Sequence, residues 1–181
     1  MSDAAKSYAK IADAFTERVR AVPPDAWDNA APCDGWVARD VVKHLVEWVP
    51  GFCQSFAGIE LPSGPSPDED PVGAWEALDR AIRDAMAQAD ATTFDTPMGK
   101  MTFAESMGAF VNGDVLVHTW DIARATGQDE TLDSHEVHSL YESMEPMDAV
   151  LRDSGHFGPR VAVPDDADEQ TKLIAFTGRT P

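Results

Sequence analysis

The stretch Asp114-Val115-Leu116-Val117-His118-Thr119-Trp120-Asp121 decides how this chain is interpreted. It lies inside a longer segment whose apolar residues recur with helical periodicity. Asp114 and His118 are four residues apart, so on a helix their side chains lie one above the other on the same face. A carboxylate and an imidazole placed in this way can bind one metal ion, although the same spacing also occurs as a simple polar contact within a helix.

His44 is the third candidate ligand, because it lies between Val41 and Trp48 on the apolar face of a second amphipathic segment. Two helices of one bundle can bring such ligands together. Asp114 also lies among apolar positions, where an unpaired carboxylate costs on the order of several kcal/mol, so a metal, an arginine or a helix N-terminus should offset its burial. Two imidazoles and a carboxylate suit Zn²⁺, Ni²⁺, Fe²⁺ or Mn²⁺ and leave an open coordination position.

The alternative is that these three residues form hydrogen bonds in the core and bind no metal. Isolated buried histidines are usually satisfied in that way. The remaining histidines do not extend the candidate site, because His135 and His138 flank a predicted helix start and His156 lies in the tail. We expect all three of them to be solvated.

The composition predicts one acidic domain spanning residues 1–181, of which 43% are hydrophobic. The net charge of −18 argues against nucleic-acid partners and against anionic membrane surfaces. No apolar run reaches the roughly 18 residues of a membrane span, and residues 1–6 lack the pattern of a secretory signal. Cys33 and Cys53 are too few for a disulfide framework, so we expect a reducing cytoplasm.

The periodicity predicts an all-α fold with four longer helices around one core, followed by a helical and extended C-terminal segment. The expected helices cover residues 3–21, 37–56, 71–90, 102–126, 134–154 and 168–176. Asp34 is the expected cap of the second helix, and Pro50 predicts a kink or an early end there. The segment 94–101 is expected to be an extended crossover, and Pro146 to bend the fifth helix.

Several motifs taken together resemble the DinB-like, mycothiol-dependent maleylpyruvate isomerase superfamily. They are Pro32-Cys33-Asp34-Gly35-Trp36, then Arg39-Asp40-Val41-Val42 with His44, and Asp114-x-x-x-His118-Thr119-Trp120-Asp121-Ile122-Ala123-Arg124-Ala125-Thr126-Gly127. Phe157-Gly158-Pro159 and the ending Leu173-Ile174-Ala175-Phe176-Thr177-Gly178-Arg179-Thr180-Pro181 resemble an actinobacterial branch of largely uncharacterised metal-binding proteins. The resemblance spans nearly the whole chain.

The resemblance implies a four-helix bundle that binds a divalent metal, commonly zinc with nickel as an alternative, through His44, Asp114 and His118. The isomerase carries Glu where this chain has Asp114, whose side chain is one methylene shorter. Characterised relatives use mycothiol or bacillithiol as cosubstrate, and a metal-bound thiol loses its proton to become a nucleophile. The implied partners are therefore a small-molecule thiol and an electrophile, while a homodimer is left open as the assembly.

Two arginines are candidate catalytic residues under this resemblance. Arg124 lies one turn beyond Asp121, and Arg179 lies where the isomerase has a functional arginine near its C-terminus. The alternative for both is a surface ion pair. Asp121 is either an acceptor that orients an imidazole or a cap or salt bridge to Arg124, and Cys33 is expected to be structural. The nearby tryptophans are expected to form core or pocket wall: Trp36, Trp48 and Trp120.

Three functions remain open at this point. The first is a metal-dependent thiol transferase or isomerase, in which His118→Ala removes both metal and activity. The second is a non-catalytic metal-binding helical bundle, in which the same substitution removes the metal only. The third is an acidic helical module without metal that acts through a partner, in which the substitution alters packing alone.

Overall fold

The computed structural model describes residues 2–89, 92–96, 99–153 and 157–181, and it is mostly helical, as the sequence predicts. The helices are α1 (Asp3–Arg20), α2 (Ala38–Ala57), α3 (Pro71–Gln88), α4 (Phe103–Phe110), α5 (Asn112–Thr126), α6 (Ser134–Met144), α7 (Asp148–Asp153) and α8 (Glu169–Phe176). The strands are β1 (Thr93–Thr96) and β2 (Gly99–Thr102). His156 and the predicted end of the third helix at residue 90 lie outside the described residues.

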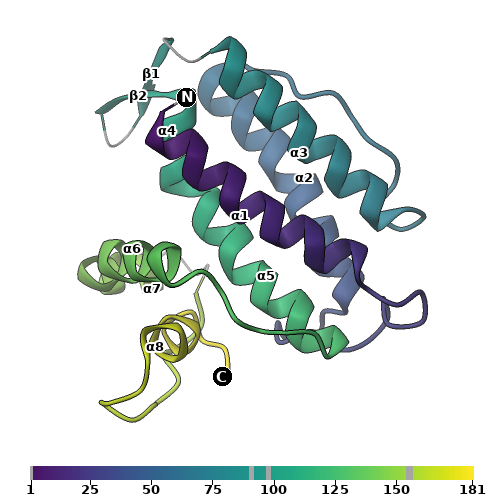
Figure 1. Ribbon diagram of the computed structural model, residues 1–181. Helices are drawn as coiled ribbons and strands as arrows, with labels where there is room; N and C mark the ends of the chain where they lie inside the picture. The colour runs from purple at the N-terminus through teal and green to yellow at the C-terminus, as the bar shows by residue number, and fades with distance from the viewer. Residues whose placement is uncertain (1, 90–91, 97–98, 154–156) are drawn as a thin grey trace.

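The long helices pack side by side, with α1 against α3 and α5, and α2 against the same two helices (Figure 1). Their apolar stripes meet in a core that contains Tyr8, Phe15 and Trp75, all fully buried. The Phe15 and Trp75 rings meet edge to face at 4.5 Å, and the indole N–H of Trp75 donates to the hydroxyl of Thr16 at 2.8 Å. The described helices include none that is both long and apolar enough to cross a membrane.

The second helix covers nearly the predicted range, but its N-terminal cap differs from expectation. Asp34 does not cap α2; instead the carboxylate of Asp40 accepts a hydrogen bond from the backbone N–H of Val37 at 2.9 Å. Of the kink or early end expected at Pro50, the early end is wrong, because α2 continues to Ala57. Val49 is fully buried beside Pro50, and packing of this kind outweighs the hydrogen bond that a proline removes.

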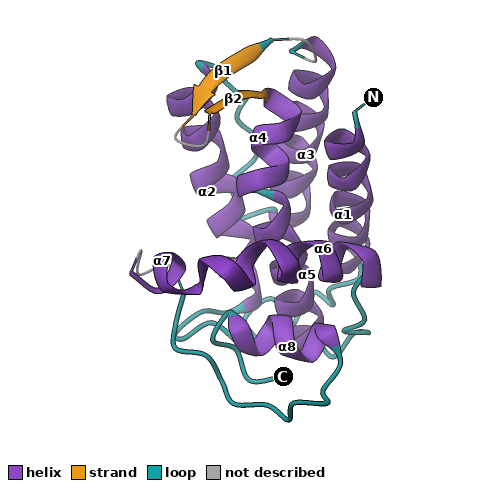
Figure 2. Cartoon of the chain, turned by 90° about the vertical axis from the view of Figure 1, so that its left-hand side faces the viewer, coloured by secondary structure: helices purple, strands orange, loops and turns teal. Residues whose placement is uncertain are grey.

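The segment between α3 and α4 is an antiparallel pair of strands, β1 with β2, rather than a crossover (Figure 2). Thr102 then caps α4 as predicted: its hydroxyl accepts from the N–H of Glu105 at 3.2 Å, and the Glu105 carboxylate accepts from the N–H of Thr102 at 2.7 Å. The single helix expected over residues 102–126 is divided at Val111, whose φ is −107°. The weak helix former Gly113 follows within two residues.

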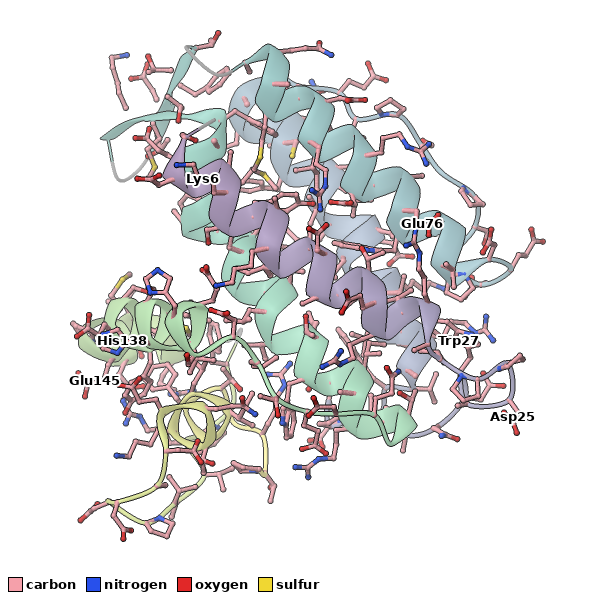
Figure 3. All side chains as sticks on the ribbon, in the orientation of Figure 1. Lys6, Asp25, Trp27, Glu76, His138 and Glu145 are labelled. Carbon is pink, nitrogen blue, oxygen red and sulfur yellow. The ribbon has the colours of Figure 1, made fainter. Side chains whose placement is uncertain are left out.

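The C-terminal segment lies against one side of the long helices (Figures 1 and 2). A 3-10 turn, Glu145–Met147, carries Pro146 and divides α6 from α7, as expected for a proline bend. Residues 157–168 form no helix or strand and lead to α8, which packs against α6. His138 on α6 (Figure 3) lies 3.0 Å from the Glu169 carboxylate at the start of α8.

The chain turns sharply after α8 at Gly178, whose φ is +90°. A Cβ atom there would lie only 3.1 Å from the Cα of Gly158. Glycine therefore serves two needs at this position: the positive φ and the close approach of two backbone segments. The turn directs the last residues toward α5 and places Arg179 beside Asp121.

Candidate metal centre

The three predicted ligands lie together between α2 and α5. His44 Nε2 is 3.1 Å from Asp114 Oδ2, and His118 Nε2 is 3.3 Å from Asp114 Oδ1. One donor atom from each of the three residues lies within 4.8 Å of the other two. The imidazole rings meet edge to face, with centroids 5.1 Å apart. The Nε2 atoms of both rings therefore face one carboxylate, and a divalent ion can bind between these three groups.

Local helix geometry explains this convergence. Asp114 lies in the first turn of α5, and His118 follows one turn later on the same face. Leu45 of α2 and Val115 of α5 are buried members of the core, and α2 packs against α5. The His118 side chain is 4% exposed, whereas those of His44 and Asp114 are 33% and 30% exposed. The site therefore opens to solvent on the side of His44 and Asp114.

Two tryptophans form the wall of the site, as the sequence suggested. Trp48 donates its indole N–H to Asp114 Oδ2 at 2.9 Å, which fixes the carboxylate. Trp36 stacks on the His118 ring with centroids 5.9 Å apart, and lies 5.1 Å from the His44 ring. The third tryptophan, Trp120, is 2% exposed and belongs to the core.

The other ring nitrogen of His118, Nδ1, contacts the carboxylate of Asp121. His118 Nδ1 lies 2.7 Å from Asp121 Oδ2. Arg179 donates from Nε to Asp121 Oδ1 and from Nη2 to Asp121 Oδ2, each at 2.7 Å. Asp121 is completely buried, so its charge depends on these partners. It orients an imidazole and is paired with Arg179, so the alternative of a salt bridge to Arg124 is wrong.

The electrostatics follow from these contacts. Burial alone would raise the pKa of Asp114, but the attraction of His118 and hydrogen bonds from His118 and His44 hold it well below its ordinary value. Burial disfavours a charged His118, yet Asp114 and Asp121 outweigh it and raise the pKa of His118 to about 9. Burial would likewise raise the pKa of Asp121, but His118 and Arg179 lower it. Without a metal, His118 is therefore protonated at neutral pH and bridges two carboxylates.

Comparison with known proteins now identifies the family. The family described as "Mycothiol maleylpyruvate isomerase N-terminal domain" matches residues 8–123. This chain belongs to that family. The matched region includes His44, Asp114, His118 and Asp121, and it ends before Arg124.

Two relatives of this family member come from Mycobacterium tuberculosis. They are the uncharacterized protein MT0763 of strain CDC 1551 and the uncharacterized protein Rv0738 of strain H37Rv. Each is 29% identical over 185 residues, a span that covers 98% of this chain and 98% of the relative. No solved structure is significantly similar to this chain.

The donor set of this member of the mycothiol maleylpyruvate isomerase family could hold a divalent metal ion. His44 and His118 offer imidazole nitrogens and Asp114 an oxygen, a combination suited to Zn²⁺ or Ni²⁺. A hydrogen bond from Nδ1–H to a carboxylate is also the usual support behind a ligating histidine, and Asp121 is placed to accept it.

Cys33 joins this network, which the sequence did not predict. Its sulfur lies 3.6 Å from Asp121 Oδ2 and 3.3 Å from Arg179 Nη2. Burial and the Asp121 carboxylate raise the pKa of Cys33 to about 12, so it remains a thiol at neutral pH, in agreement with a structural role. Cys33, His118 and Asp121 form a second group with metal-ligand spacing. Because Arg179 already holds both oxygens of Asp121, the group containing Asp114 suits a metal better.

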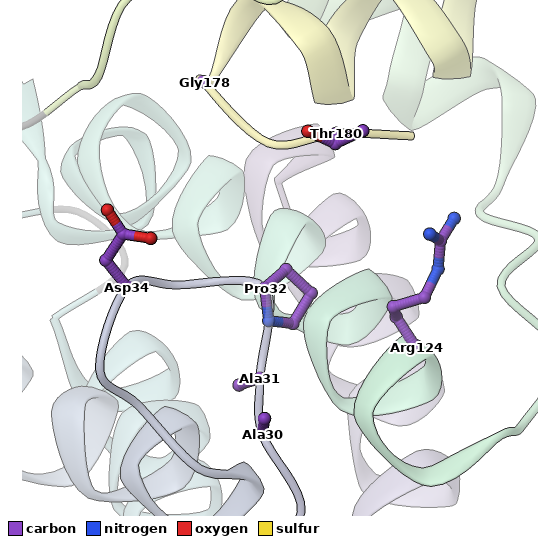
Figure 4. Close-up of a pocket in the computed structure, with 7 residues that line it drawn as sticks. All are labelled: Ala30, Ala31, Pro32, Asp34, Arg124, Gly178 and Thr180. Carbon is purple, nitrogen blue, oxygen red and sulfur yellow. The ribbon is translucent and has the colours of Figure 1, made fainter.

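Arg124 has other partners than the candidate ligands. Its guanidinium donates to both oxygens of Glu130, at 2.6 and 2.7 Å, and stacks 4.5 Å from the Trp120 ring. It forms one side of a pocket of about 320 Å³, with Asp34 on the opposite side (Figure 4). The remaining lining residues are Ala30, Ala31, Pro32, Gly178 and Thr180. The hydrogen bonds found for Arg124 within the described residues reach none of the three candidate ligands, and its catalytic role stays a prediction.

Proposed function

We propose that this protein binds one divalent metal ion, preferably Zn²⁺ with Ni²⁺ as the alternative, through His44, Asp114 and His118. We further propose that it activates a low-molecular-weight thiol such as mycothiol for transfer to an electrophile or for isomerisation. The observation that carries the proposal is the convergence of the three donor atoms within 4.8 Å. Membership of a mycothiol-linked family supports the choice of thiol.

The metal, when bound, would lower the pKa of a coordinated thiol enough to give a nucleophile at neutral pH. The chain's own residues prepare the site for it. Asp121 accepts the Nδ1–H of His118, which leaves Nε2 with a free lone pair once the imidazole is neutral. Arg179 keeps Asp121 ionised, and Trp48 fixes the Asp114 carboxylate. Three protein ligands leave a position for the thiol.

The two arginines take different parts in this proposal. Arg179 acts through Asp121 and is a positioning residue. Arg124 stands at the rim of the pocket that also contains Gly178 and Thr180, where it can contact the polar sugar portion of the thiol. Its pairing with Glu130 means that a ligand must compete with that carboxylate.

The domain organisation is part of the same proposal. We propose a single domain over residues 1–181, in which α1, α2, α3 and α5 form a DinB-like four-helix bundle. The segment from α6 to α8 is its extension and brings Arg179 to the site. The continuous cluster of buried side chains from α1 to α8 supports one domain. Cys33 and Cys53 are both free thiols, which fits the reducing cytoplasm expected from the sequence.

Metal content tests the first half of the proposal. Protein purified without chelators and without a histidine tag should contain about one Zn²⁺ or Ni²⁺ per chain, since a three-ligand site holds one ion. The variants His44→Ala and His118→Ala should lose it. His138→Ala is the matched control, because His138 lies on α6 and its side chain is 47% exposed. Native protein that takes up no metal even after reconstitution would refute the site.

A thiol-transfer assay tests the second half. The zinc-loaded protein is mixed with mycothiol and a panel of electrophiles, and consumption of the free thiol is followed. Transfer that disappears in His118→Ala and persists in His138→Ala supports the proposal. Metal binding without any thiol consumption would refute the catalytic part and favour the non-catalytic metal-binding bundle.

A further inference from the structure

We propose that Trp36 sets the coordination number of the metal centre, because its indole covers one side of the centre and leaves room for a single exogenous ligand. The ligands that such a centre accepts are thiols that bind through sulfur alone, and those that it excludes are chelators with two donor atoms. This inference rests on the proposed function and adds the role of a residue that supplies no ligand atom.

Trp36 contacts both histidines of the centre through its ring. The indole lies 5.1 Å from the His44 ring, centroid to centroid. It lies 5.9 Å from the His118 ring and is nearly parallel to it, with 21° between the two planes. The two imidazoles are themselves 5.1 Å apart. The three rings therefore form a closed triangle in which the indole covers one side of the imidazole pair.

The exposure of the three candidate ligands shows which approach the indole closes. The side chain of His118, on which the indole stacks, is only 4% exposed, whereas those of His44 and Asp114 are 33% and 30% exposed. Trp36 is itself partly buried and packs against the core. An incoming ligand therefore reaches the centre past His44 and Asp114. Removal of the indole would open a second approach over His118.

The loop that carries Trp36 holds the indole in place. Ala30 and Val37 form an antiparallel bridge at its base. The backbone N–H of Ala31 donates to the carbonyl of Trp36 at 2.9 Å, and the N–H of Trp36 donates to the carbonyl of Cys33 at 3.0 Å. Both backbone groups of Trp36 are thus bonded within the loop, so the indole is positioned before a metal binds.

A second indole limits the number of donor atoms that the protein supplies. The N–H of Trp48 donates to Asp114 Oδ2 at 2.9 Å, which disfavours binding of an ion by both oxygens of that carboxylate. His44 and His118 offer one nitrogen each. The protein therefore supplies three donor atoms, and one exogenous ligand completes the four-coordinate geometry that Zn²⁺ prefers.

The charges of the loaded centre are also balanced by one thiolate. A divalent ion brings two positive charges, Asp114 brings one negative charge, and the two histidines bind as neutral imidazoles. Behind them, Arg179 compensates the charge of Asp121. The centre with its ion therefore carries one net positive charge, which a single thiolate neutralises. One monodentate sulfur ligand thus satisfies both the coordination number and the charge.

Co²⁺ tests the inference, because it binds donor sets of this kind and its visible absorption reports the coordination number. Tetrahedral Co²⁺ absorbs more strongly than octahedral Co²⁺, since a tetrahedral site lacks a centre of inversion. We expect strong absorption from the native protein loaded with Co²⁺. Trp36→Ala should weaken this absorption at unchanged cobalt content, because further solvent ligands enter. Trp36→Phe keeps a ring against the imidazoles and should retain the native spectrum.

Acetohydroxamate, a small chelator with two oxygen donors, tests the consequence for ligands. Trp36→Ala should bind it more tightly than the native protein by about tenfold or more, since the second oxygen then adds an intramolecular contact. The affinity for ethanethiol, which binds through one sulfur, should not change. Phe110→Ala is the matched control, because Phe110 is another partly buried ring and its ring contacts are with Phe52 and Phe56. It should leave the spectrum and both affinities unchanged.

Unchanged absorption in Trp36→Ala, or an unchanged affinity for acetohydroxamate, would overturn the inference, and so would a native Co²⁺ protein that is already octahedral. If Trp36→Ala fails to hold cobalt, Trp36→Leu takes its place, because it keeps an apolar side chain on the loop.

The outcomes also separate the two proposals. If the native protein binds no cobalt through His118, the proposed metal site is refuted and this inference with it. A cobalt spectrum that depends on His118 but not on Trp36 refutes the inference alone. A spectrum that depends on Trp36, in a protein that consumes no thiol, refutes the catalytic function alone.

Discussion

Replacing Asp121 by asparagine tests the account of the buried network most directly. The substitution keeps the shape of the side chain and one carbonyl oxygen, so packing changes little. It removes the only negative charge in direct contact with Arg179 among the hydrogen bonds of the described residues, and one of two negative charges beside His118. We expect Asp121→Asn to lower both the free energy of unfolding and the affinity for metal.

The magnitude follows from burial. Asp121 is 0% exposed and the Arg179 side chain 14% exposed, so the remaining charge is poorly solvated. Removing one partner of a buried pair costs about 3–5 kcal/mol, and the retained oxygen places this case near 3 kcal/mol. At about 2–4 °C per kcal/mol for a chain of this size, the melting temperature should fall by about 6–12 °C. Metal affinity should fall by about 10–100-fold, the usual effect of removing the acceptor behind a ligating histidine.

Urea unfolding in the presence of a chelator measures the stability change apart from metal binding, and titration with Zn²⁺ measures the affinity. Asp95→Asn is the control, since Asp95 forms an exposed ion pair with Lys100 and should leave the unfolding midpoint unchanged. The double variant Asp121→Asn/Arg179→Met should cost less than the sum of the two single variants. A loss below about 1 kcal/mol in Asp121→Asn, smaller than one buried hydrogen bond, would refute the reasoning.

Four further predictions concern pH, proton release on metal binding, the tail and a helix cap. The pKa of His118 rises from 6.5 to about 9 on folding. In the metal-free protein, the contribution of His118 to the free energy of unfolding should therefore be complete below pH 6.5 and should be lost as the pH rises through about 9. Urea unfolding midpoints measured across that pH range test this expectation. Zinc binding at pH 7 should correspondingly release about one proton from His118, measurable by calorimetry in buffers of different ionisation enthalpy; no release would contradict a protonated metal-free site. Gly178→Ala should destabilise by about 1–3 kcal/mol, because φ is +90° and the new Cβ meets Gly158, and an unchanged melting temperature would show that the turn can relax. Thr102→Ala should cost about 1 kcal/mol by urea unfolding through loss of the cap shared with Glu105, whereas Thr102→Ser should cost far less.

The candidate ligands could be predicted from the sequence because the relevant geometry is local. A spacing of four residues places Asp114 and His118 on one face of any helix, and the apolar neighbours of His44 direct it toward another helix. Capping signals are equally local, and Thr102 with Glu105 behaves as expected. These inferences need no knowledge of how distant segments pack.

The incorrect predictions concern features that are determined by packing between segments far apart in the sequence. Pro50 lowers helix propensity, yet buried neighbours carry α2 past it. The sequence analysis named only Arg124 as a salt-bridge partner of Asp121, whereas the structure pairs Asp121 with Arg179. Arg124 is three residues from Asp121 and Arg179 is 58 residues away, so proximity in sequence favours the wrong arginine. Only the path of the chain around α8 brings Arg179 to Asp121.

The contact between Arg179 and Asp121 makes the last turn of the chain and the ligand His118 parts of one thermodynamic cycle. If docking of the tail strengthens metal binding by some free energy, metal binding strengthens docking of the tail by the same amount, because coupling between two sites is reciprocal. Metal occupancy thus reports on the order of a segment that supplies no ligand. Under the proposed metal site, a ligand that displaces the residues around Gly178 would weaken metal binding without contacting the ion.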